Sequence, residues 1–128
     1  MELAAILATI LIVVIAAFQA SLALGVPAGA AAWGGQHPGV LPPRLRVASG
    51  AVALLVYPAI ALAILRTAGL VDTGEFGDGW GATGIWVLAA FFLVGAIMNG
   101  LSRSRPERAW GPVSLVISVC CVVVALSA

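Results

Sequence analysis

The chain has 128 residues, of which 62% are hydrophobic and 9% are charged, and its formal net charge is +1. A soluble domain carries roughly 25% charged residues, so this composition excludes an ordinary soluble protein and favours a single integral membrane domain with room for about four helical spans. The charges lie between the apolar runs, because a charge at the centre of a bilayer costs on the order of 3 kcal/mol. We expect the lipid bilayer as the main partner and no nucleic acid.

Four apolar runs predict transmembrane helices at about residues 3–24, 47–65, 81–101 and 109–127. We expect the first run to be a retained helix, because a cleaved signal peptide begins with a basic segment and this chain begins Met1-Glu2. Pro58 is expected to kink the second span, because proline removes a backbone hydrogen bond. The predicted fold is an all-α, four-transmembrane-helix bundle with a structured, Gly/Pro-rich first cytoplasmic loop.

That first loop, Gly25–Arg46, carries the single histidine, His37, and four of the seven prolines. Loops of this length in compact proteins are usually functional or disordered, and the lack of charge before Arg44 argues against disorder. The AGAAAW segment at 28–33 favours a helical turn or two, and QHPG at 36–39 favours a tight turn.

The arginines predict the orientation of the chain in the membrane. Arg66 alone falls on the side of the second loop. The other five arginines fall on the side of the first and third loops: Arg44, Arg46, Arg103, Arg105 and Arg108. Basic residues near span ends favour the cytoplasm. We therefore expect a multi-pass protein of the cell inner membrane with both termini extracytoplasmic.

The second loop then lies outside and carries Asp72, Glu75 and Asp78. These carboxylates lack the alternating ligand spacing of a calcium loop, so cation binding there is disfavoured. The lone His37 has no cysteine or carboxylate nearby in sequence. The adjacent Cys120 and Cys121 point about 100° apart on a helix and do not form a redox pair. We expect no metal, no cofactor and no catalytic set, which argues against an enzyme.

Several polar side chains are predicted at a similar depth, in the cytoplasmic half of the bundle: Gln19, Ser49, Asn99, Ser114 and Ser118. They could hydrogen-bond across helices to hold the bundle together. Alternatively, they could line a polar vestibule capped by the first loop. The basic loops likewise have two interpretations, contact with anionic lipid that fixes the orientation or a dedicated site for an anion or a phospholipid headgroup. Glu107 is expected to pair with an arginine.

Two segments carry a resemblance: FQASLALGVPAGAAAWGGQHPGVLPPRLRVAS, and later MNGLSRSRPER. They resemble a group of small bacterial four-helix integral membrane proteins with a GxHPGxLPxRLR loop and an MNxxSRS motif, whose activity is uncharacterised. The resemblance implies a fold and a topology. It selects seven candidate binding residues: Gln19, His37, Arg44, Arg46, Asn99, Ser102 and Arg103.

Two functions are favoured at this point, and a third, a membrane enzyme that would rest only on His37 and Glu107, is disfavoured. The leading one is a non-enzymatic binding or accessory membrane subunit whose cytoplasmic vestibule takes a lipid headgroup, a small solute or another membrane subunit. The alternative is a small channel or transporter for an ion or small solute, assembled as a homo-oligomer because four helices rarely enclose a wide pore.

Overall fold

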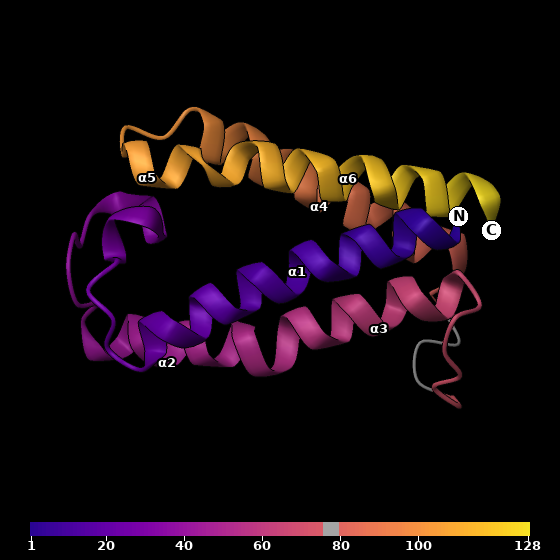
Figure 1. Cartoon of the computed structure of the whole chain (residues 1–128), viewed down its shortest axis with the longest axis horizontal. Helices are drawn as coiled ribbons and strands as arrows, with labels where there is room; N and C mark the ends of the chain where they lie inside the picture. Colours follow the sequence, from indigo (N-terminus) through magenta and orange to yellow (C-terminus); the bar gives the residue numbers. More distant parts are fainter. Residues whose placement is uncertain (76–79) are drawn as a thin grey trace.

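A computed structural model describes residues 1–75 and 80–128. Within these residues all regular structure is helical, and four helices are long and apolar enough to cross a membrane, which confirms the predicted fold (Figure 1). In chain order the elements are α1 (Glu2–Ala23), η1 (Gly29–Ala31), η2 (Trp33–Gly35), α2 (Pro43–Ala51), η3 (Val52–Val56), α3 (Tyr57–Thr67), α4 (Gly81–Gly100), α5 (Arg105–Arg108) and α6 (Trp110–Ser127).

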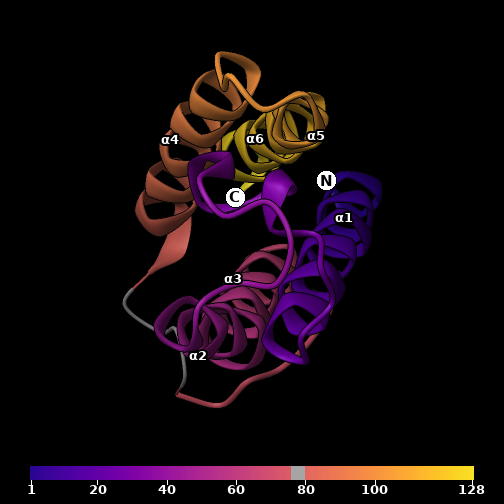
Figure 2. The same cartoon turned by 90° about the vertical axis from the view of Figure 1, so that its left-hand side faces the viewer.

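The helices form two layers. One layer holds α1 against the continuous helix α2–η3–α3, and the other holds α4 against α6 (Figures 1 and 2). The layers converge at the end that carries both termini and diverge toward the opposite end, where α2 and α5 lie. The apolar core follows this shape, because small residues such as Ala5, Ala8 and Ala125 are buried where the layers meet.

The second span begins earlier than the sequence predicts, at Pro43 rather than near residue 47. Proline fixes its own φ near the helical value and needs no hydrogen-bond acceptor, so it suits the first position of a helix. The prediction that Arg44 and Arg46 belong to the loop is therefore wrong, since both lie on α2. The guanidinium Nε of Arg46 donates a hydrogen bond, 3.2 Å long, to the carbonyl of Ala23 at the end of α1.

The disturbance expected at Pro58 takes the form of a π-helical turn, η3, directly before it. The N–H of Tyr57 donates to the carbonyl of Val52, five residues back, instead of four. Residues five apart on a regular α-helix are separated by about 140°, whereas a π turn brings them close to one face. Val52 and Tyr57 consequently both face the space between the two layers.

The layer of α4 and α6 is tightly packed. A Cβ atom on Gly111 would lie 3.2 Å from the Cα of Gly100, so the close approach of the two backbones depends on the missing side chain of Gly111. Deeper in the same interface, the hydroxyl of Ser118 donates a 2.7 Å hydrogen bond to the carbonyl of Ala89. Ser118 thus serves the bundle itself, as the first of the two interpretations of the polar residues predicts.

Candidate functional site: a cavity beneath the first loop

The segment between α1 and α2, residues 24–42, folds back over the open end of the bundle and is called the lid below (Figure 2). Its ends are drawn together by a 2.9 Å hydrogen bond from the N–H of Gly29 to the carbonyl of Gly39. Leu41 is buried against Leu22 and Ala32, which gives the lid a small apolar core of its own. Helical turns are present where AGAAAW predicts them, in 3₁₀ form, whereas the expected tight turn at residues 36–39 is only a bend.

The lid is fastened to both layers of the bundle. On one side, the indole Nε1 of Trp33 donates a 2.9 Å hydrogen bond to the hydroxyl of Ser49, which is fully buried on α2. On the other side, the N–H of Gly34 donates a 2.8 Å bond to Oε2 of Glu107 on α5. The hydroxyl of Ser104 also donates to the carbonyl of Ala30. The last two of these bonds connect segments that lie more than seventy residues apart in the sequence.

Trp33 adopts an unusual backbone conformation at the centre of these contacts. Its φ is +51°, which makes it the one non-glycine residue with a left-handed backbone among the residues described. That conformation costs an L-residue roughly 1–2 kcal/mol. The lid therefore holds Trp33 in place against a local preference, and it does so where the side chain reaches from the lid into the bundle.

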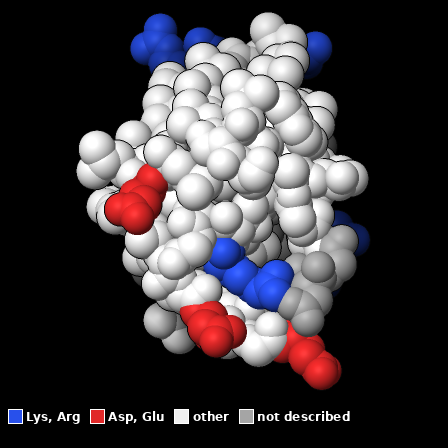
Figure 3. All heavy atoms as spheres, turned by 90° about the vertical axis from the view of Figure 1, so that its right-hand side faces the viewer, with Lys and Arg blue, Asp and Glu red and all other residues white. Residues whose placement is uncertain are grey.

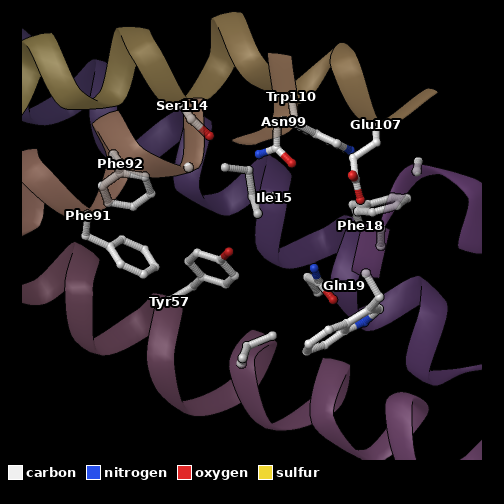
Figure 4. A pocket seen from close by; sticks show the side chains of 15 residues that line it. Ile15, Phe18, Gln19, Tyr57, Phe91, Phe92, Asn99, Glu107, Trp110 and Ser114 are labelled. Atoms are coloured by element: carbon white, nitrogen blue, oxygen red, sulfur yellow. The ribbon is translucent and has the colours of Figure 1, made fainter. Parts of the chain in front are cut away.

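A cavity of about 270 Å³ lies between the layers, directly beneath the lid. Figure 4 shows its walls, to which α1, η3, α3, α4, α5, α6 and the lid all contribute side chains. The lining residues are Ile15, Phe18, Gln19, Ala31, Ala32, Trp33, Val52, Tyr57, Phe91, Phe92, Gly95, Asn99, Glu107, Trp110 and Ser114.

Polar groups from four helices face this cavity (Figure 4). Oε1 of Gln19 is buried from solvent and has no hydrogen-bond partner among the residues that the structure describes. The amide of Asn99 and the hydroxyls of Tyr57 and Ser114 also belong to the lining. A buried polar group without a partner costs on the order of 1–3 kcal/mol. Gln19 therefore holds its amide in the cavity at the expense of stability.

Glu107 gives the cavity its charge. Its side chain is only 7% exposed, and its described partner is the backbone N–H of Gly34 rather than the arginine that the sequence suggests. The lining residues include no arginine and no histidine. The one formal charge on the described wall is accordingly negative.

Aromatic rings make up much of the remaining wall: Phe18, Trp33, Tyr57, Phe91, Phe92 and Trp110. The rings of Phe18 and Trp110 lie with their centroids 4.9 Å apart and join α1 to α6. Phe91 and Phe92 pack edge to face with centroids 5.2 Å apart. Since Phe91 and Phe92 precede Asn99 by seven or eight residues on α4, they lie about 10 Å deeper along the helix. Aromatic rings therefore line both the end near the lid and the deeper part of the cavity, whereas the charged Glu107 lies at the lid.

The structure brings only two of the seven predicted binding residues into the cavity, Gln19 and Asn99. Five are not part of its lining: His37, Arg44, Arg46, Ser102 and Arg103. Ser102 accepts a hydrogen bond from the N–H of Ser104, and its carbonyl accepts one from Arg108, so it shapes the connector before α5. Arg44 and Arg103 are exposed. The arginines thus lie outside this cavity, and a headgroup site formed by facing arginines receives no support from its lining.

Thirteen of the fifteen lining residues were not among the predicted site residues, and three of these carry polar or charged groups that matter for binding: Trp33, Tyr57 and Glu107. The position of Tyr57 beside Pro58 was a usable signal, because π turns are frequent at functional sites. Glu107 and Trp33 carried no local signal, since their placement depends on contacts between the lid and α5.

The opposite end of the molecule has a different character. Figure 3 shows acidic side chains around basic atoms near the centre of this end, with further basic atoms only at the rim of the view. In the second loop, Asp72 accepts a hydrogen bond from the N–H of Gly74, and Glu75 is exposed. Asp78 lies outside the described residues. No group of three or more potential metal ligands occurs among the residues that the structure covers.

The chain was also compared with known proteins. Neither a scan against protein-family models nor searches of curated proteins and of solved structures found a match.

Proposed function

We propose that this chain is a membrane-embedded binding protein whose cavity beneath the lid takes a small amphipathic molecule. The observation that carries the proposal is Oε1 of Gln19, a buried acceptor without a partner in the wall of a cavity that also holds Asn99 and Ser114. Residues that only hold helices together use up their hydrogen bonds on one another, as Ser118 and Ser49 do. Gln19 does not, which favours a ligand as its partner.

The size and position of the cavity support binding rather than a continuous pore. A volume of about 270 Å³ lies just below the roughly 300–1,000 Å³ typical of sites for drug-sized molecules. The two layers converge beyond the cavity onto a core of small apolar residues. In a single chain of this shape, the ligand binds at the lid end of the bundle, and the described residues leave it no open path to the other end.

The orientation is part of the proposal. The positive-inside rule favours the arginine-bearing end, and with it the lid, on the cytoplasmic side of a bacterial inner membrane. The resemblance to small bacterial four-helix membrane proteins agrees with this arrangement. Ligands would then enter from the cytoplasm or the inner leaflet.

The test is a search for a molecule that co-purifies with the chain. Wild type, the double variant Gln19→Met/Asn99→Leu and the control Ser127→Ala are purified in parallel, and their organic extracts are compared by mass spectrometry. Ser127 bonds only within its own helix at the far end. A compound retained by wild type and control but lost from the double variant supports the proposal. Identical extracts from all three preparations, combined with unchanged function in the cell, would refute it.

A further inference from the structure

We infer that the ligand of this cavity is a small organic ammonium ion with an apolar or aromatic body; the inference rests on the proposed binding function and names its substrate class. The first argument is charge. Glu107 is buried in the wall, and none of the lining residues is basic. A buried carboxylate is costly unless it is paired, and the described part of the chain supplies only a backbone N–H. A cation in the cavity would complete the pairing.

The second argument is the kind of polar atom in the cavity wall. Oε1 of Gln19 is a buried acceptor that has no donor among the residues the structure describes. The carboxylate of Glu107 engages Gly34 through Oε2, which leaves Oε1 free of any hydrogen bond that the structure records. An ionised carboxylate only accepts hydrogen bonds, whereas an ammonium group only donates them. Both acceptors therefore match an ammonium head, and an anionic headgroup would meet repulsion.

The third argument is the aromatic content of the wall. Cations are attracted to the faces of Trp, Tyr and Phe rings within about 6 Å, and most strongly where water is excluded. Phe18 and Trp110 lie in the same part of the cavity as Glu107 and Gln19 (Figure 4). Trp33 also lines the cavity and directly precedes Gly34, which donates to Glu107. The deeper wall, with Phe91 and Phe92, suits an apolar body. The ligand is thus oriented with its charged head near the lid.

The experiment uses two probes of nearly the same shape, phenethylammonium and 2-phenylethanol, which differ mainly in charge, together with the anion 3-phenylpropanoate. Each is titrated calorimetrically into the detergent-solubilised full chain at pH 7, with empty micelles as the blank. We expect phenethylammonium to bind at least about tenfold more tightly than 2-phenylethanol, and no binding of 3-phenylpropanoate. In a Trp80→Phe/Trp86→Phe variant, both remaining tryptophans line the cavity. Adding phenethylammonium to this variant should therefore shift the wavelength of its tryptophan fluorescence.

Glu107→Gln isolates the charge, because glutamine keeps an oxygen that can accept the hydrogen bond from Gly34 and so preserves the lid. It should weaken phenethylammonium binding at least about tenfold and leave 2-phenylethanol unchanged. Glu75→Gln removes an exposed charge at the far end of the molecule and should change neither. Gln19→Met should weaken both probes, because it removes a hydrogen-bond acceptor that either can use.

Equal affinity of wild type for phenethylammonium and 2-phenylethanol would overturn the ammonium assignment. A Glu107→Gln variant that binds phenethylammonium as tightly as wild type would overturn it as well. If the chain retains a co-purifying neutral or anionic molecule and ignores phenethylammonium, the assignment fails while the binding function stands. If no molecule co-purifies and no probe binds, both fail together.

Discussion

Replacing Gln19 with methionine should make the ligand-free protein more stable. Methionine keeps the length and approximate volume of glutamine but removes the buried acceptor that has no partner. An unsatisfied buried polar group costs about 1–3 kcal/mol. Because only one atom of the amide is in this state and the cavity is partly open, we expect a gain near the lower limit, about 1 kcal/mol in the free energy of unfolding.

Ser118→Ala is the matched control, since it removes a polar group that does have a partner. Its hydroxyl donates to the Ala89 carbonyl within the α4–α6 interface. Hydrogen bonds between transmembrane helices contribute about 0.6 kcal/mol on average, so this variant should lose about that amount. The two substitutions therefore have opposite predicted signs.

Reversible unfolding in mixed micelles, followed by circular dichroism or by steric trapping, gives both free energies. The same Gln19→Met preparation should show reduced retention of the co-purifying compound, so stability and binding move in opposite directions. A loss of about 1 kcal/mol or more in Gln19→Met would refute the reasoning. It would mean that the amide holds the bundle together and that its partner lies within the protein.

Three further predictions concern the lid, the orientation and transport. Gly29→Ala should displace the lid, because a Cβ there would lie 2.0 Å from the backbone oxygen of His37; hydrogen exchange of amides 29–39 should accelerate at least severalfold while helix content stays unchanged, and equal exchange would show that the lid is not closed by this contact. With Cys120 and Cys121 replaced by alanine, His37→Cys should react with an impermeant thiol reagent only from the cytoplasmic side and Glu75→Cys only from outside, and the reverse pattern would invert the proposed orientation. Purified chain in liposomes should give no flux of small ions or of phenethylammonium above empty vesicles, and flux that scales with protein content would instead favour the channel or transporter.

If the cavity binds a ligand as proposed, its occupancy would act on the lid. The carboxylate of Glu107 contacts the lid through Gly34 and faces the cavity. A cation at Glu107 would therefore act on the same residue that fastens the lid to α5. The hydrogen bond between Trp33 and Ser49 fastens the other side and does not involve a charge.

The sequence by itself determines the class and the plan of this protein. Hydrophobic runs long enough to cross a bilayer predict the four helices, because hydrocarbon leaves the backbone few other ways to satisfy its hydrogen bonds. The same runs predict the shared depth of Gln19 and Asn99, which depends only on distance along a helix. Pro58 marks the interrupted helix, since its missing N–H is a local property. The start of the second span is less well predicted, because helical Pro43 and Arg44 resemble loop residues in composition.

The tertiary structure alone decides which of these residues form a site. Gln19 and Ser118 look alike in the sequence as polar residues within apolar spans. Only packing shows that Ser118 has a partner, while Oε1 of Gln19 has none among the described residues. Glu107 has arginines on both sides of its short helix, yet it turns to the N–H of Gly34, seventy-three residues away. Such a contact depends on how the lid folds back over the bundle, which no local pattern of residues specifies. The charge of the cavity follows from that long-range contact.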